Sequence, residues 1–289
     1  MNGVLLATLS LTVGVMLMLA LWRNVDRRVD QNAWARLAAQ QKVAPTRFDP
    51  ALVADLPAAA QRYFLHAIKP GTSLKTVAVI VMRGQLGLGD ATKPNYQPMR
   101  AEQILAPPHG FIWRLRAGTG AMRLSGSDGA ESGRSWSRFW LLGVLPVARA
   151  GGTANHFRSA FGRYVAEAVF WTPAALLPSE TVRWDTIDES STRVTLTHRG
   201  LAQSVDLTVA PDGRLTQVSF QRWSDANPVG QFQMQPFGGY LADYRDFGGY
   251  RLPTHIEAGN FFGTDDYFPF FKVTVTDVHF PTIGRLAPP

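Results

Sequence analysis

The first apolar stretch of the chain runs from Gly3 to Trp22 and contains no charged residue. At a rise of about 1.5 Å per residue, a helix of this length spans about 30 Å, which matches the hydrocarbon core of a bilayer. Trp22 and Arg23 follow where aromatic rings and long cations mark the membrane interface. The pattern predicts an uncleaved single-pass anchor over residues 1–23. A cleaved signal peptide is the alternative and fits less well, because the segment has neither a basic n-region nor a small-residue cleavage site.

Three further segments after the anchor carry apolar residues at helical spacing. Residues 24–54 are expected to form a juxtamembrane segment with a short helix. One face of that helix would carry Trp34, Leu37, Ala38 and Gln41. A second helix is expected between Pro57 and Ile68, with Asp55 as its cap and Pro70-Gly71 as its stop. A third is expected from Asn155, as its cap, to about Phe170, before Pro173.

Elsewhere the hydrophobic period is two, which is typical of half-buried antiparallel strands. The clearest hairpin turns at Pro211-Asp212-Gly213. The expected strands are 76–86, 111–117, 122–125, 192–198, 204–209, 215–223, 251–258 and 271–280. So many strands must curl or close. We therefore expect a mainly β (α+β) fold, in which a curved antiparallel sheet or open half-barrel carries helices against its concave face. No flexible linker interrupts residues 55–289, which are expected to form a single domain.

Basic residues follow the anchor on one side only. The segment after Trp22 carries Arg23, Arg27, Arg28, Arg36, Lys42 and Arg47, whereas the short N-terminal tail carries no Lys or Arg. Because Lys and Arg near a span mark its cytoplasmic side, this favours a cytoplasmic domain on the cell (inner) membrane. The absence of cysteine is uninformative here, since only disulfides would demand an oxidising compartment.

The net charge of +7 is concentrated in the first 163 residues, next to the anchor. A basic surface there favours attraction to anionic headgroups, and a merely solvated basic face is the alternative. Nucleic acid is not expected as a partner, because no basic run with interleaved aromatics and no helix-turn-helix or RNA-binding signature is present.

The chain lacks the common sequence motifs of catalytic sites. There is no cysteine, G-x-S-x-G elbow, P-loop or H-E-x-x-H motif, and the six histidines have no metal-like spacing. We expect neither a metal nor a cofactor. Asp128 and Glu167 are the best candidates for acid–base chemistry, but Glu167 is four residues after Arg163 and is expected to form a helical ion pair with it.

Aromatic residues exceed what one thin sheet face needs. They predict either a large filled core or an apolar cavity between the curved sheet and a helix, the usual form of a lipid or acyl-chain site. The candidate cavity-lining residues are Phe111, Trp113, Phe161, Trp171, Trp184 and Trp223.

Several motifs resemble an uncharacterised bacterial family of membrane-anchored β-rich domains. They occur in order between residues 55 and 280: Leu56-Pro57, Arg62-Tyr63-Phe64, Met82-Arg83-Gly84-Gln85, Pro107-Pro108-x-Gly110-Phe111-x-Trp113, Ala166-Glu167-Ala168-x-Phe170-Trp171-x-Pro173, Val182-x-Trp184, Asp212-Gly213, Asp243-Tyr244-Arg245 and Leu252-Pro253-Thr254. The closing pattern also resembles lipoprotein-carrier (lipoprotein localisation factor) folds. That resemblance implies a lipid-binding cavity and a periplasmic domain, contrary to the Lys and Arg count.

Two functions follow from these observations. The first is a membrane-tethered, non-catalytic β domain that binds an apolar ligand such as a lipid or acyl chain. The second is an accessory subunit of a larger membrane complex, with its anchor packed on other helices and its basic face on a partner. An enzyme built on Asp128 and Glu167 is a weaker third hypothesis.

Overall fold

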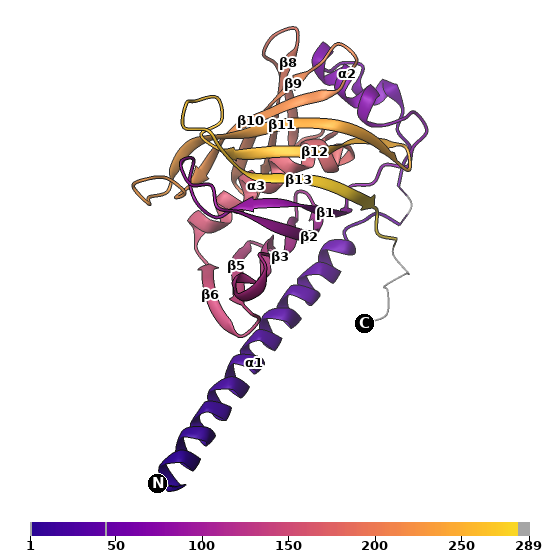
Figure 1. Ribbon diagram of the computed structural model, residues 1–289. Helices are drawn as coiled ribbons and strands as arrows, with labels where there is room; N and C mark the ends of the chain where they lie inside the picture. Colours follow the sequence, from indigo (N-terminus) through magenta and orange to yellow (C-terminus); the bar gives the residue numbers. More distant parts are fainter. Residues whose placement is uncertain (1, 44, 283–289) are drawn as a thin grey trace.

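The computed structural model describes residues 2–43 and 45–282. Its long first helix, α1 (Asn2–Ala38), projects from a domain built on one large sheet (Figure 1). Two further helices, α2 (Ala58–Ala67) and α3 (Ala154–Trp171), belong to that domain. Three 3-10 turns complete the helical elements: η1 (Pro50–Val53), η2 (Gly120–Met122) and η3 (Pro173–Leu176).

All the described strands belong to one open antiparallel sheet in the order β6-β5-β4-β3-β2-β1-β13-β12-β11-β10-β9-β8-β7. Their bounds are β1 (Ala78–Gly87), β2 (Tyr96–Ala106), β3 (Gly110–Ala117), β4 (Leu124–Glu131), β5 (Arg134–Leu141), β6 (Leu145–Gly151), β7 (Val182–Thr186), β8 (Ser191–His198), β9 (Leu201–Val209), β10 (Leu215–Ser224), β11 (Gln233–Phe247), β12 (Tyr250–Asn260) and β13 (Phe268–His279). Two meanders, β1–β6 and β7–β13, join where β1 pairs with β13. The expected fold class, a large open antiparallel sheet with helices, is confirmed.

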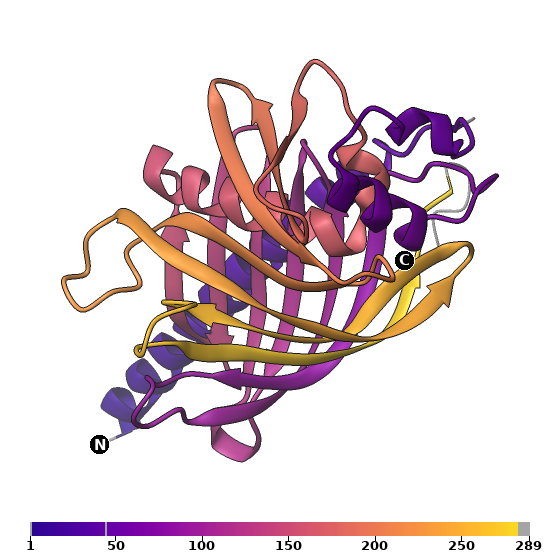
Figure 2. The same ribbon diagram turned by 90° about the horizontal axis from the view of Figure 1, so that it is seen from above.

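The sheet curves around α3, which lies against its concave face and crosses from β5 to β10 (Figure 2). Apolar residues on one face of α3 enter the main core, among them Phe161, Val165 and Trp171. Gly162 lets the helix approach β9 closely, since a Cβ there would lie 2.7 Å from Oε1 of Gln203. The helix α2 packs beside β8, β9 and β12 and extends the same core.

The C-terminal half of α1 packs on the opposite, outer face of β1–β5. Ala33 and Leu37 are buried there in a small second core with Ile104 and Ile112. The predicted helical spacing of Trp34, Leu37 and Ala38 is thus confirmed, whereas Gln41 lies beyond the end of the helix at Ala38, so its place on that helix was wrong. Within residues 2–43 and 45–282, α1 is the one helix long and apolar enough to cross a membrane, and its first half is exposed.

Ion pairs also hold the C-terminal half of α1 against the outer face of the sheet. Asp26 accepts two hydrogen bonds from Arg149, at 2.7 and 2.9 Å, and Asp30 accepts one from Arg114 at 2.6 Å. Near the end of the helix, Arg36 donates in the same bidentate way to Glu131, at 2.9 and 3.0 Å. Bidentate arginine–carboxylate pairs restrict geometry as well as adding energy, so α1 is held in one orientation.

Two predicted helix caps were wrong. The Thr153 side chain caps α3 by accepting from the His156 amide, whereas the Asn155 side chain accepts from Trp223. At α2 the N-cap position is Pro57 itself, which makes no side-chain cap, and Asp55 lies two residues before it. In each case the favoured cap residue type was present, but a neighbouring residue occupied the position that the backbone geometry requires.

Candidate functional site

A cavity of about 240 Å³ lies between α3 and the concave face of the sheet. An engineered cavity of roughly 150 Å³ holds a benzene ring, so this one has room for part of a single acyl chain. Most of its wall is apolar. The lining comes from Leu86, Trp113, Asp128, Arg163, Ala166, Glu167, Phe170, Trp171, Val218, Phe220, Arg222, Phe237, Gly238, Gly239, Leu241, Ile256, Ala258, Phe270 and Phe271.

One polar patch in this wall is a closed ionic cluster. The Arg163 guanidinium donates to Asp128 at 2.5 Å and to Glu167 at 2.7 Å, and Gln103 donates to the second oxygen of Glu167 at 2.5 Å. The guanidinium also lies over the Phe111 ring, 4.6 Å from its centroid. The predicted helical pair of Arg163 and Glu167 is confirmed. Because both carboxylates are engaged by one cation, the cluster is a structural ion pair rather than a poised acid and base.

Arg222 on β10 is the second cation of the cavity. It lies over the Phe237 ring at 5.0 Å, and its buried Nε atom has no hydrogen-bond partner within the described residues. Burial, with Arg163 nearby, lowers the pKa of Arg222 to about 10. The side chain therefore stays charged at neutral pH inside a largely apolar wall.

Two indole groups share this property with Arg222. The Nε1 atoms of Trp113 and Trp171 are buried and also lack a partner among the residues that the structure describes. Leaving a buried donor unpaired costs about 1–3 kcal/mol. All three donors belong to residues that line the cavity, but the donor atoms themselves lie behind its surface.

The structure separates the six predicted cavity residues. Trp113 and Trp171 line the cavity, whereas Phe111 is buried beneath Arg163. The other three lie elsewhere: Phe161 packs edge-on against Tyr164, Trp184 packs against Tyr63 and Phe64 of α2, and Trp223 stacks with Phe232.

Arg222 was not among the predicted cavity residues, although the alternation along β10 indicates that it faces the cavity. Val218, Phe220 and Arg222 alternate at period two along β10, so all three point to one face.

The described residues around the cavity carry few reactive groups. Within the described residues, no group of three or more His, Asp or Glu side chains is placed to hold a metal ion. The carboxylates of the cavity face the Arg163 guanidinium, and among the described residues no serine, threonine or lysine lines the wall. What the wall offers is apolar contact and positive charge.

The sequence matches the model of a family of unknown function, DUF6544, over residues 46–273. The chain belongs to this family. The predicted resemblance to an uncharacterised family is therefore confirmed. The DUF6544 match includes all the strands of the sheet except the end of β13, and it begins after α1.

Two solved structures are similar to the chain. One is a domain from Vibrio parahaemolyticus named for outer membrane lipoprotein sorting, with 13% identity, a TM-score of 0.38, and coverage of 73% of this chain and 87% of that one. The other is a LolA superfamily protein from Nitrosomonas europaea, with 13% identity, a TM-score of 0.38, and coverage of 80% and 94%. Both are of the lipoprotein-carrier type named above on sequence grounds. A search of the curated proteins finds no match to this chain.

Proposed function

We propose that this protein is a membrane-tethered, non-catalytic domain that holds an apolar ligand, such as a lipid or acyl chain, in the cavity beneath α3. The observation that carries the proposal is a cavity of about 240 Å³ that combines aromatic and aliphatic walls with the cation Arg222. An acyl chain fits the apolar walls, and a carboxylate head group is attracted to the charge of Arg222.

Filling the cavity tests this proposal. Ala166 is a small residue of α3 that lines the cavity, so Ala166→Phe places a ring where the ligand would lie. The full chain is purified in mild detergent, its lipids are extracted, and the bound species are counted by native mass spectrometry. We expect wild type to retain an acyl-chain lipid and Ala166→Phe to lose most of it.

The matched control is Ala154→Phe, which adds the same ring at an exposed position at the start of α3. It is expected to retain as much lipid as wild type. A cavity that holds only water would yield no lipid from wild type. That result, or equal lipid in wild type and Ala166→Phe, would contradict the proposal.

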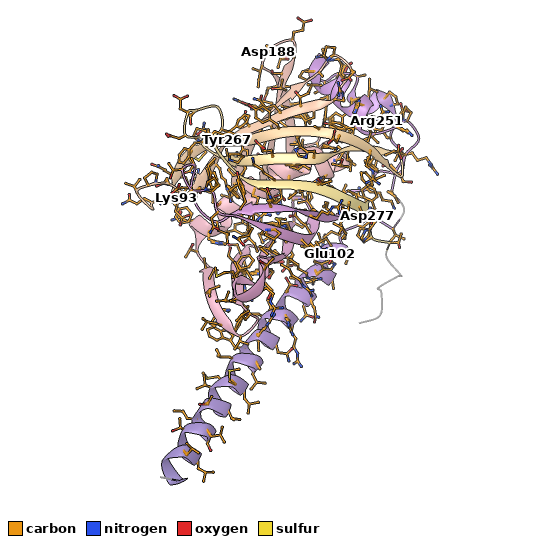
Figure 3. All side chains as sticks on the ribbon, in the orientation of Figure 1. Lys93, Glu102, Asp188, Arg251, Tyr267 and Asp277 are labelled. Carbon is orange, nitrogen blue, oxygen red and sulfur yellow. The ribbon has the colours of Figure 1, made fainter. Side chains whose placement is uncertain are left out.

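We further propose that residues 1–23 anchor the chain in the cell (inner) membrane, with the domain on the cytoplasmic side as the arginines after Trp22 favour. Because the chain has no cysteine, one introduced thiol is a clean reporter of sidedness. Glu189 is exposed beside Asp188, which Figure 3 shows at the far end of the molecule from the N-terminus.

In intact cells, Glu189→Cys is expected to react with a membrane-permeant maleimide and to resist an impermeant one until the cells are lysed. Labelling of intact cells by the impermeant reagent would place the domain on the other side. Release of the protein into the soluble fraction would contradict the anchor itself.

A further inference from the structure

Three arginines lie opposite one another on the outer face of three neighbouring strands, and we call them the arginine ladder. Arg83 on β1 is in register with Arg100 on β2, which is in register with Arg116 on β3. All three are exposed, and within residues 2–43 and 45–282 none has a carboxylate oxygen within 4.0 Å. Like charges directly opposite each other destabilise a sheet. The ladder thus carries a cost that an anion would remove.

The arginine ladder lines a groove of about 810 Å³ between the sheet and α1. Arg23 and Arg27 of α1 line the same groove, so the ladder faces further positive charge across it. An adjoining hollow of about 560 Å³ shares Arg23, Arg100 and Arg116. The groove is therefore a continuous basic surface rather than a scatter of solvated side chains.

The carboxylates of this groove are already engaged. Asp26 and Asp30 accept hydrogen bonds from Arg149 and Arg114, as described above. Glu102, which Figure 3 shows beside α1, lies 3.9 Å from Arg114. The ladder arginines are consequently left to an external anion.

An apolar turn lies at the bilayer end of the groove. The β5–β6 turn exposes Leu142, Val144 and Leu145, and its Gly143 carbonyl accepts a hydrogen bond from Arg23. Next to Arg23, the Trp22 ring packs edge-on against Trp140 of β5, with centroids 5.8 Å apart. Because Trp and Arg at the end of a span lie at headgroup depth, the turn and the groove meet the bilayer surface at this level.

We propose that the arginine ladder binds the phosphate groups of anionic phospholipids in the bilayer that α1 enters. The inference rests on the proposed anchoring of α1 and is independent of the ligand in the inner cavity. Guanidinium groups bind phosphate oxygens through two parallel hydrogen bonds. The anchor supplies the source of phosphate, since it holds the ladder at a lipid surface at all times.

The test uses the full chain in mild nonionic detergent with equal amounts of phosphatidylglycerol and phosphatidylcholine. Native mass spectrometry counts the retained lipids in wild type, in the ladder variant R83Q/R100Q/R116Q and in R134Q/R183Q/R251Q, which changes three exposed strand arginines outside the groove. We expect wild type to prefer phosphatidylglycerol, the ladder variant to retain roughly tenfold less, and the control to match wild type.

Other outcomes would overturn the proposal. Equal phosphatidylglycerol retention by wild type and the ladder variant would do so, and an acidic protein partner on this face would give that same result. Displacement of the lipid by inorganic phosphate at unchanged ionic strength would show that free phosphate is the ligand. Loss of phosphatidylglycerol in Ala166→Phe but not in the ladder variant would place the lipid in the inner cavity, which supports the proposed function while refuting the ladder.

Discussion

Arg222 is the residue that most separates the cavity from an ordinary filled core. A charge in an apolar wall is costly unless it is paired, and its Nε atom has no partner in the described structure. The lowered pKa of Arg222 has the same origin, because burial and the nearby Arg163 both disfavour the charged form of its side chain. Residues that are unfavourable for the empty fold but suited to a ligand are typical of binding sites.

We therefore expect Arg222→Met to separate stability from binding. Methionine has a similar length and no charge to desolvate, so the free energy of unfolding of the ligand-free chain should rise by about 1 kcal/mol. Retention of acyl-chain lipid should fall at the same time. Chemical denaturation and lipid extraction measure the two effects. A variant that is less stable than wild type would show that Arg222 supports the fold instead.

Glu131 makes the docking of α1 sensitive to acid. Hydrogen bonds from Arg36 outweigh burial and hold the pKa of Glu131 below its ordinary value. A lowered folded-state pKa means that the pair adds stability above the ordinary glutamate range, near pH 4.3, and that this stability is lost as the pH falls through the folded pKa.

Glu131→Gln is accordingly expected to lower Tm at neutral pH and to flatten the decline of Tm below about pH 5. Thermal unfolding of the full chain across this range provides the measurement. Glu180→Gln, at an exposed loop position, is the matched control and should keep the wild-type slope. Parallel wild-type and Glu131→Gln profiles would assign the acid sensitivity to other carboxylates.

At the scale of elements, periodicity in the sequence located the helices and seven strands, reached only the first two residues of β4, and missed β2, β5, β6, β7 and β11. The physical reason is clearest for β11, where Pro236, Gly238 and Gly239 give the composition of a turn. Glycine is required there because a Cβ on Gly239 would lie 2.1 Å from the Glu257 carbonyl oxygen of β12. Close approach of a neighbouring strand, which no local pattern reports, explains the residue choice.

Docking of α1 is an element-scale property that one side chain tests. Leu37 is buried in the small outer core, and Leu37→Ala should cost that core about 2–3 kcal/mol. Because this core contacts α1 and not α3, amide hydrogen exchange should accelerate over residues 24–38 and stay unchanged over α3. Leu21→Ala, exposed on the same helix, is the control. Faster exchange throughout the domain would mean that the outer core is part of one cooperative unit.

For the whole molecule, the site depends on contacts that are remote in sequence. The cavity wall combines β1, β3 and β4 from the first meander with β10 to β13 from the second, and the two meanders join where β1 pairs with β13. From sequence alone, alternation placed Trp113 inward and helical spacing paired Arg163 with Glu167. The pairing of two strands about 190 residues apart, and hence the cavity, had no local signature.

If α1 spans a bilayer as proposed, its docking on the sheet fixes the orientation of the domain about the bilayer normal. A flexible tether would let the cavity point in any direction. Here α1 is one continuous helix whose C-terminal half is hydrogen-bonded to the sheet, so the helix and the domain rotate together. Each residue added within the anchor would swing the domain by about 100° and lift it by about 1.5 Å. The number of residues in the anchor would therefore set the direction that the cavity faces within the membrane plane. On this proposal, the length of the helix matters as well as its hydrophobicity.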